Sequence, residues 1–569
     1  MPDRRRVPKV LSGAVGLAAV LAVAFLLAPP LGTDLSAQVA RANFFGRHGS
    51  AVLDLGWYAG ISPYGYSLFT PPLMHWLGAD ALGPRLAGAL ALLGSAAALA
   101  LLMVRTGARR PLLGATVGAA CIAGNLVSGR ITYAVGVAFG LLALLALTST
   151  FRPALRLGAA GIAAALAGAA SPVAGLFVVL AGVSKEGPPL IAFGGRRAPA
   201  KHLSLDGLVL VAGAGVPVVA LGLVFGAGGW MNISLVDTVT AAVPSVLVAL
   251  LVPRREVRVG AVLATLGVLA AFAIRTPVGL NATRLAAMFA LPVLVGYGTL
   301  PAGLVRRWSR RTAGAALVAI VALVAVVEPP VSVADLRAAG DPTASRGYFT
   351  PLLTELAGRP PGRIEVVPTA NYWEAAYVPE AAPLARGWLR QADQAHNRLF
   401  LDGSVDAESY GHWLRDNGVR YVALAGAEPS WVGRREAELI RGGLPYLTPV
   451  WQHPDWTLYA VTGAPSVVQA LGAGAVGPGG GDPPDGVEGA VPGTPGAELV
   501  RATSVELTVD VPAAGETLVR LRWSRWLRVE GGGDACLAPY ADWTVLRVTQ
   551  PGRYSITGSL TGAGPRCPG

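Results

Sequence analysis

The chain has 569 residues, of which 53% are hydrophobic and only 14% charged, and its formal net charge at pH 7 is +12. A soluble protein is nearer a quarter charged, and many apolar runs here approach the roughly 20 residues that span a bilayer core, so a soluble globular fold is excluded. In a membrane protein, excess arginine is typical of loops that face an anionic cytoplasmic surface, so the charge does not indicate nucleic-acid binding.

The apolar runs predict an α-helical polytopic membrane bundle over residues 1–328. The first run follows three arginines and Lys9 and has no small-x-small cleavage site, so we interpret it as a retained signal anchor. About eleven spans are predicted, at 10–29, 83–104, 111–128, 131–149, 156–170, 172–183, 207–227, 241–253, 258–274, 285–300 and 312–328. The short pair at 156–183 is separated by Ser171 and Pro172, which indicates a broken helix or a re-entrant hairpin.

The basic residues predict the orientation of the bundle. With a cytoplasmic N-terminus, each inner loop holds two to four Lys or Arg residues, whereas the short outer loops hold only Arg41, Arg47, Arg85, Arg130, Arg275 and Arg284. This bias follows the positive-inside rule. We therefore expect a multi-pass protein of the cell membrane in which everything after Glu328 is extracytoplasmic.

Residues 329–569 have a soluble-like composition and predict two extracytoplasmic domains. An α/β domain over 345–465 is indicated by "GRIEVVP" (362–368), "AESYGHWLRDNGVRYVALAG" (407–426) and "WTLYAVTG" (456–463). A Gly/Pro-rich linker over 466–499 follows, and then short alternating runs predict a β-sandwich-like module over 500–569.

The chain has three cysteines, and two of them suggest a disulfide. Cys121 lies in an apolar run, whereas Cys536 and Cys567 flank a short polar region of the C-terminal module. Disulfides require an oxidising compartment, so a Cys536–Cys567 bond agrees with an extracytoplasmic C-terminus.

The first outer loop, residues 30–82, is unusually long and polar. "DLSAQVARANFF" (34–45) predicts an amphipathic interfacial helix capped by Thr33 or Asp34, and "TPPLMHWLGADALG" (70–83) predicts the start of another helix. The segment between them is punctuated by Gly and Pro and carries Asp54, Trp57, Tyr58, Tyr64 and Tyr66. Polar residues at the rim of a bundle are candidates for function.

This loop resembles that of the GT-C superfamily of membrane glycosyltransferases. The resemblance lies in an acid at the outer end of the first span, followed by two interfacial helices around "GWYAGISPYGYSLFTPPL" (56–73). The stretch is most similar to actinobacterial polytopic integral membrane proteins. Outside the loop the resemblance is weaker, and it assigns no role to "YWEAAYVPE" (372–380) or "RYVALAG" (420–426).

The resemblance implies a transferase that moves a sugar from a polyprenyl-phosphate donor to an envelope glycan or lipid acceptor on the outer face. Asp34 matches the acid that acts as general base or binds a divalent metal, and Asp54 is a candidate second acid. Arginines suit phosphate binding, which makes Arg41, Arg130, Arg275 and Arg284 candidates. Stacking on a sugar is the role expected for Trp57, Tyr58, Tyr64 and Tyr66. Because Leu35 follows Asp34 and no Asp-x-Asp occurs, the dependence on a metal stays open.

Each of these residues also has a structural interpretation. Asp34 could serve only as a helix cap, the arginines could reach lipid head groups, and the aromatic residues could form an interfacial belt. In the C-terminal module, Trp523, Trp526, Tyr540 and Trp543 could form a sugar platform or, as we favour, a small core.

Two other functions therefore stay open. One is a multi-span transporter, which predicts a midplane cavity between two related halves. The other is a non-catalytic envelope scaffold that binds glycan, which predicts no buried cavity and an Asp34 engaged in a local cap. A glycosyltransferase predicts that Asp34 faces a cavity near at least one of the arginines.

Overall fold

The computed structural model describes residues 6–186, 204–226, 228–301, 303, 309–463, 466–471, 496–561 and 567. The chain divides into two compact units. The helical unit comprises Met1–Gln38 and Tyr64–Ala339, and the mixed unit comprises Val39–Pro63 and Gly340–Gly569. The long polar loop of the sequence is thus shared between the two units.

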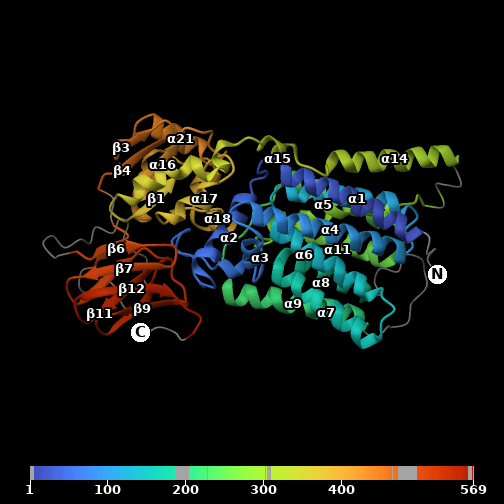
Figure 1. Cartoon of the computed structure of the whole chain (residues 1–569), viewed down its shortest axis with the longest axis horizontal. Helices are drawn as coiled ribbons and strands as arrows, with labels where there is room; N and C mark the ends of the chain where they lie inside the picture. Colours follow the sequence, from blue (N-terminus) through green and yellow to red (C-terminus); the bar gives the residue numbers. More distant parts are fainter. Residues whose placement is uncertain are drawn as a thin grey trace. The chain divides into compact units, whose positions relative to one another are not determined.

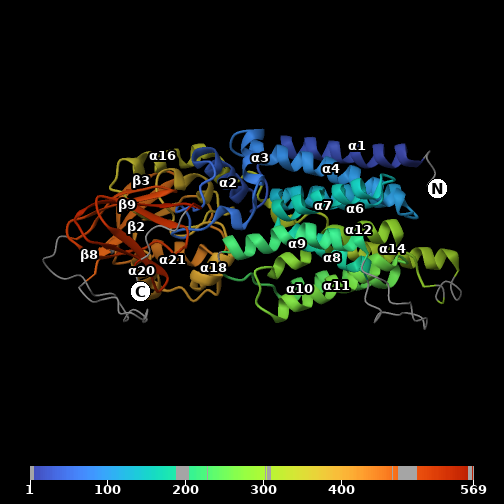
Figure 2. The same ribbon diagram turned by 90° about the horizontal axis from the view of Figure 1, so that it is seen from below.

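The helical unit is a bundle of apolar helices, several of which lie side by side in Figures 1 and 2. Every predicted span coincides with a helix in the described part of the chain. These helices are α1 (Arg6–Leu27), α4 (Leu82–Arg105), α5 (Pro111–Val127), α6 (Ile131–Leu147), α7 (Pro153–Ala170), α8 (Pro172–Glu186), α9 (Leu205–Phe225), α10 (Leu235–Leu251), α11 (Arg255–Ala273), α12 (Arg284–Tyr297) and α14 (Arg310–Val327). The shorter α2 (Leu35–His48), α3 (Thr70–Leu77) and α15 (Val333–Arg337) lie between or after them.

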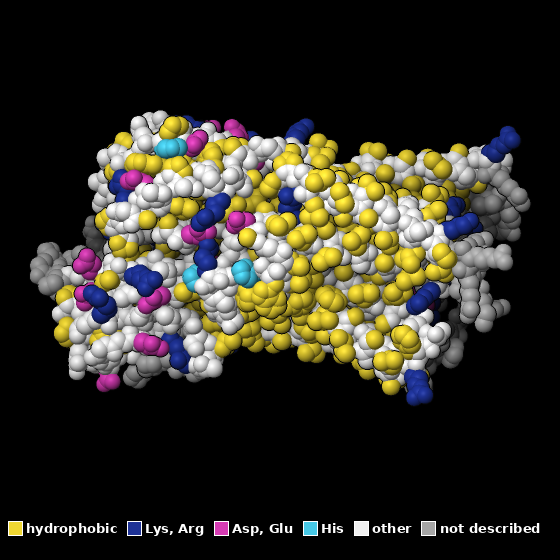
Figure 3. All heavy atoms as spheres, in the orientation of Figure 1, with side chains coloured by type: hydrophobic (Ala, Val, Ile, Leu, Met, Phe, Trp, Pro, Cys, Tyr) yellow, Lys and Arg dark blue, Asp and Glu magenta, His cyan; other side chains and the backbone are white. Residues whose placement is uncertain are grey.

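The bundle is that of a multi-pass membrane protein. Among the described residues, six helices are long and apolar enough to cross a bilayer by length and composition, and shorter apolar helices accompany them. Many side chains between the helices are alanines, which allow close helix packing. Large apolar side chains such as Val20, Ile162 and Leu223 face outward instead, and Figure 3 shows hydrophobic side chains covering the bundle surface in that view.

The pair at 156–183 is a helical hairpin of two separate helices. Ser171 between α7 and α8 has an extended backbone, and Pro172 begins α8, where its missing N–H costs no helical hydrogen bond. The two helices cross closely, because a Cβ on Gly175 would lie 2.7 Å from the Cα of Gly168. Both helices also pack on α9.

The mixed unit contains an α/β domain built on a four-stranded sheet of order β1-β2-β4-β3. β1 (Arg363–Val366) and β2 (Val419–Ala425) are parallel, while β4 (Trp456–Val461) is antiparallel to β2 and to β3 (Leu447–His453). The helices of this domain are α16 (Arg346–Ala357), α17 (Glu374–Tyr377), α18 (Arg390–His396), α19 (Arg398–Leu401), α20 (Ala407–Asp416) and α21 (Arg434–Arg441). Its core includes the buried Tyr410, Leu414, Val422 and Ile440.

Two four-stranded sheets form the C-terminal β module, with orders β10-β11-β8-β5 and β6-β7-β12-β9. Their strands are β5 (Val468–Ala470), β6 (Glu498–Ala502), β7 (Glu506–Val511), β8 (Gly515–Val519), β9 (Leu527–Gly531), β10 (Ala535–Tyr540), β11 (Trp543–Val548) and β12 (Gly552–Gly558). Buried side chains such as Val509, Ile556, Leu518 and Val545 make its core. The linker was predicted over 466–499, but its first residues include β5 and so belong to the module. Residues 472–495 lie outside the described residues.

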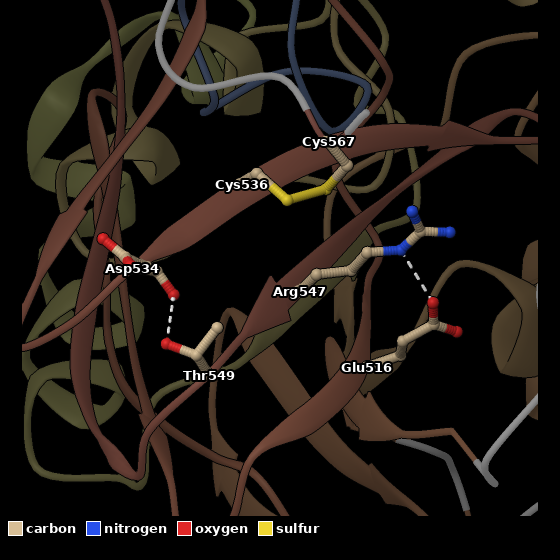
Figure 4. The surroundings of a disulfide bond; sticks show 6 residues. All are labelled: Glu516, Asp534, Cys536, Arg547, Thr549 and Cys567. Carbon is tan, nitrogen blue, oxygen red and sulfur yellow. Dashed lines mark hydrogen bonds and ion pairs between the residues drawn. A yellow bond between two sulfur atoms is a disulfide. The ribbon is translucent and has the colours of Figure 1, made fainter. Parts of the chain in front are cut away.

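Cys536 and Cys567 are joined by a disulfide, the pair that the sequence suggested. The bond ties the C-terminal end of the chain to β10 (Figure 4). On the neighbouring strand β11, the Nε of Arg547 donates to Glu516 Oε1 of β8 at 2.7 Å. The bond therefore anchors the chain end to a sheet that is also held by cross-strand pairs.

Residues 39–63 of the first loop fold as part of the mixed unit. The Leu55 N–H donates to the Ser504 carbonyl at 2.7 Å, and the Gly56 carbonyl accepts from the Leu384 N–H at 2.9 Å. The Nε1 of Trp57 donates to the Ala375 carbonyl at 3.0 Å. The loop is therefore bound to both the α/β domain and the β module.

Candidate functional site

The candidate site lies in the helical unit, where a carboxylate meets two arginines from distant segments. Asp34 directly precedes α2, Arg130 directly precedes α6, and Arg284 is the first residue of α12. Arg130 Nε lies 3.3 Å from Asp34 Oδ2, and an Arg284 guanidinium nitrogen lies 3.9 Å from the same oxygen. The sequence predicted each residue separately, and the fold brings these three together.

Two glycines let the backbone position Asp34 beside Arg130. Gly32 (φ +81°) and Gly129 (φ +78°) adopt the left-handed region, and each packs directly against the other segment. A Cβ on Gly32 would lie 2.3 Å from the Ser128 carbonyl carbon, and a Cβ on Gly129 would lie 2.3 Å from the Leu35 nitrogen. This close contact allows the Asp34 N–H to donate to the Ser128 carbonyl at 3.3 Å.

Only one of the two carboxylate oxygens of Asp34 contacts the arginines. Both arginines approach Oδ2, whereas Oδ1 makes no hydrogen bond with another residue in the described ranges. The side chain is 24% exposed, so a ligand can reach it. Among the described residues, no first-turn N–H group of α2 donates a hydrogen bond to this carboxylate, so its contacts are not those of a helix cap.

A second acid, Asp335 in α15, belongs to the same cluster and was missed by the sequence analysis. Ser128 Oγ donates to Asp335 Oδ2 at 2.5 Å. Burial raises the pKa of the Asp335 carboxyl, and the nearby charge of Asp34 adds to this effect, while Ser128 and Arg130 oppose it. The sequence did offer one indication of this residue: Asp335 is an acid just beyond the last predicted span, in a segment assigned to neither the bundle nor the α/β domain.

Arg284 lies against one wall residue of a cavity in the bundle. Its guanidinium lies 5.2 Å from the ring centroid of Tyr133, and Tyr133 and Leu285 line a cavity of about 430 Å³ inside the bundle. The walls are mostly apolar and come from α4, α6, α8, α11 and α12, among others. Along α6 the lining runs from Tyr133 to Leu147, a distance of about 21 Å for a helix. The cavity is therefore long and mostly apolar. Arg284 lies beside its Tyr133 wall without lining it, and the charged residues that line the cavity are Lys185, Arg254 and Glu256.

Tyr64 and Tyr66 also belong to the helical unit. Tyr66 lies within electrostatic range of the Arg284 guanidinium, which places it near the cluster. The Tyr64 ring packs against Phe225 at 5.3 Å, and Arg275 lies 4.9 Å from the Trp230 ring. Among the described residues, Arg275 is not within ion-pair distance of Asp34.

The other candidates of the loop lie in the mixed unit, where their contacts are structural. Trp57 and Tyr58 are 2% and 3% exposed, and the Tyr58 hydroxyl accepts from the Leu389 N–H at 3.0 Å. Arg41 lies 5.7 Å from the Trp57 ring centroid. Little of either ring is open to a ligand in this structure, and the sugar contacts expected of Trp57 and Tyr58 stay a prediction.

Asp54 is likewise buried, and its contacts shape a turn. Its main chain pairs with Ile61, and its Oδ1 accepts from the Gly56 N–H at 2.8 Å. Burial raises the pKa of the Asp54 carboxyl to about 7, although Gly56, Arg47 and Arg41 oppose this shift. These contacts hold the Asp54 side chain in a buried turn of the mixed unit.

The donor set around Asp34 does not fit a divalent metal. The immediate neighbours of the carboxylate are two guanidinium groups, which would repel a cation. Within the described ranges, no group of three or more His, Cys, Asp or Glu residues could hold a metal ion.

No protein-family model and no curated protein matches the chain. Among solved structures, it is similar to arabinofuranosyltransferase AftD from Mycobacteria, with 15% identity and a TM-score of 0.44 over 99% of this chain and 58% of that one. It is also similar to ArnT from Cupriavidus metallidurans bound to undecaprenyl phosphate, with 13% identity and a TM-score of 0.46 over 79% of this chain and 97% of that one. The chain spans about three fifths of the AftD chains that it matches.

Proposed function

We propose that the protein is a membrane glycosyltransferase that moves a sugar from a polyprenyl-phosphate donor to an envelope glycan or lipid acceptor. The observation that carries this proposal is the junction of the Asp34–Arg130–Arg284 cluster with a long apolar cavity. A donor of this class has the same two parts, an anionic phosphate and a long hydrocarbon chain.

Arg130 and Arg284 are the residues proposed to bind the donor phosphate. Guanidinium groups bind phosphate oxygens with paired hydrogen bonds, and two of them stabilise the charge of a phosphate that leaves. Their side chains are 36% and 15% exposed, so both are partly accessible to a ligand. The hydrocarbon chain would extend from Tyr133 and Leu285 into the cavity.

Asp34 is proposed as the general base. In the transfer, the bond between the sugar's anomeric carbon and the phosphate oxygen breaks, and a bond to the acceptor oxygen forms. The acceptor hydroxyl loses its proton to Asp34, and the lipid phosphate leaves with the electron pair of the broken bond. Oδ1 of Asp34 is the oxygen available for this proton, because both arginines approach Oδ2.

The decisive experiment compares wild type with Asp34→Asn in purified, detergent-solubilised protein. Each would receive radiolabelled polyprenyl-phosphate sugars and a crude envelope acceptor extract. Because loss of a general base typically costs 10² to 10⁴ in rate, we expect transfer by wild type and a loss of about 100-fold or more in the variant. An Asp54→Asn variant is the matched control and should retain transfer.

Two outcomes would contradict the proposal. Equal transfer by wild type and Asp34→Asn would remove Asp34 from catalysis. No transfer by either protein, across several donors, would favour the transport or scaffold function instead. Folding of each variant would be checked by its thermal unfolding midpoint, so that a misfolded variant is not counted.

A further inference from the structure

Three loops of the α/β domain meet at one edge of its sheet. β1 and β2 are parallel, and Leu384 pairs in parallel with Ile364 of β1, so three neighbouring segments run in the same direction. Each segment is followed by a loop with an aromatic residue. Tyr372 follows β1, Trp431 follows β2, and Trp388 follows Leu384. Loops at the carboxyl ends of parallel strands are where open α/β sheets bind ligands.

The aromatic residues of these loops form a continuous stack. The rings of Tyr372 and Trp388 lie parallel at 9°, with centroids 3.8 Å apart. The Arg390 guanidinium carbon is 5.3 Å from the ring centroids of both Trp388 and Trp431. The stack thus leads from Tyr372, which is 4% exposed, to Trp431, which is 57% exposed.

The inner end of the stack is held rigidly. Tyr372 has a backbone φ of +59°, which is unfavourable for a tyrosine and needs support from its surroundings. The buried Glu374 carboxylate provides support by accepting from the Thr369 N–H at 3.1 Å and from its hydroxyl at 2.6 Å. The Ser430 N–H donates to the Pro368 carbonyl at 2.8 Å, which joins the loop of Trp431 to the loop of Tyr372.

The outer end of the stack offers hydrogen-bond donors to a polar ligand. Arg390 makes no hydrogen bond or ion pair with another residue in the described ranges, so its N–H groups are available beside the exposed indole. Near Trp431 along the chain lie two exposed ion pairs, Arg434–Glu428 and Arg435–Glu438. Charges of both signs disfavour insertion of this surface into a bilayer.

We infer that Trp431 and Arg390 form a saccharide-binding site on the α/β domain. A sugar ring places its apolar C–H face on the exposed indole, and its hydroxyl groups accept hydrogen bonds from the guanidinium of Arg390. The site is distinct in sequence and in unit from the Asp34 cluster. If the proposed function holds, the saccharide is the acceptor glycan.

The test measures binding of the full-length detergent-solubilised protein to four immobilised biotinylated hexasaccharides. These are built of arabinofuranose, galactofuranose, mannopyranose and glucopyranose. We expect at least one to bind wild type, Trp431→Ala to weaken that binding at least tenfold, and Trp431→Phe to retain most of it. Trp451→Ala is the matched control, because Trp451 stacks on His453 within β3 of the same domain.

This binding measurement does not require the protein to transfer sugar. Asp34→Asn should bind the hexasaccharide as wild type does, so a failure of sugar transfer would leave this site standing. Absence of binding to all four hexasaccharides would overturn the inference. Equal binding by wild type and Trp431→Ala, or an equal loss in Trp451→Ala, would overturn it as well.

Discussion

At the scale of single residues, several carboxyl groups of the mixed unit differ from Asp34 in being buried. Asp54, Glu374 and Glu365 are all buried, and burial raises their pKa values to about 7, 7 and 8. The Glu365 carboxylate shares Arg386 with Glu436, which is also buried. Such groups make the stability of this unit sensitive to pH.

The sign of that sensitivity follows from the direction of the shifts. A carboxyl whose pKa is raised on folding keeps a proton that the unfolded chain releases above about pH 4. These groups therefore contribute most to the free energy of unfolding of the mixed unit below about pH 4. Their contribution falls as the pH rises toward 7 or 8.

We predict that Asp54→Asn reduces this fall. Asparagine keeps an oxygen that accepts from the Gly56 N–H but has no charge to bury. The unfolding midpoint followed by tryptophan fluorescence should decrease from pH 5 to pH 8 in wild type and decrease less in the variant. Asp510→Asn, at an exposed residue of the same unit, should leave the slope unchanged. A steeper slope in Asp54→Asn would contradict the prediction.

At the scale of elements, the segment that leads into α15 packs directly on α5. A Cβ on Gly124 of α5 would lie 1.5 Å from the Pro330 carbonyl oxygen, and that segment leads to Asp335. Because a main-chain oxygen cannot rotate away, any side chain at Gly124 must displace the segment. The acid of α15 stays near Asp34 only while this contact is preserved.

We therefore predict opposite effects from two Gly→Ala substitutions. Gly124→Ala should lower the unfolding midpoint by the equivalent of about 1–3 kcal/mol and reduce sugar transfer. Gly94→Ala in α4 is the control, because its Cβ meets nothing within 4 Å and should stabilise the helix by up to about 1 kcal/mol. Equal midpoints for the two variants would disprove the proposed contact.

The disulfide of the β module provides a further prediction at this scale. Cys536 and Cys567 are 31 residues apart, and the chain-entropy model gives about 3–4 kcal/mol for closing a loop of that length. The double variant Cys536→Ser/Cys567→Ser should unfold at lower temperature than wild type and be insensitive to reductant. Cys121→Ala should retain the reductant sensitivity of wild type, because Cys121 is a free buried cysteine.

At the scale of the whole molecule, a cavity inside the bundle reaches Tyr133, whose ring lies 5.2 Å from the guanidinium of Arg284 in the polar cluster. It is lined by residues from helices far apart in the sequence, so no single span creates it. Its length and apolar walls are what a hydrocarbon chain requires, and its contact with Tyr133 brings that chain to the arginines. The proposed specificity for a lipid donor is thus a property of the assembled bundle.

We predict that filling the cavity discriminates between donors. Ala264→Phe on α11 places a ring in the cavity, so kcat/KM should fall about tenfold or more for a long-chain donor and remain near wild type for a short-chain analogue. Ala270→Phe on the same helix faces outward and should behave as wild type with both donors. An equal fall for both donors would mean that the substitution damages the site itself.

The sequence alone determined the class of the protein and most of its elements. Apolar runs near the length of a bilayer core require membrane helices, because an unpaired backbone cannot lie in lipid, and each predicted span is a helix. The strands β1, β2 and β4 and the β-rich tail were predicted from alternation and turn residues. The strands β3, β5, β6, β9 and β10 were not predicted individually, because their place in a sheet depends on pairing with distant segments.

Only the tertiary structure decided which candidate residues act together. Spacing along the chain could not show that Asp34 meets Arg130 and Arg284, because that contact needs two left-handed glycines and the packing of helices that are distant in sequence. Nor could the sequence show that Trp57, Tyr58 and Asp54 fold into the mixed unit, where all three are buried. Composition determines which solvent an element prefers, whereas the partners of a polar side chain are determined by long-range packing.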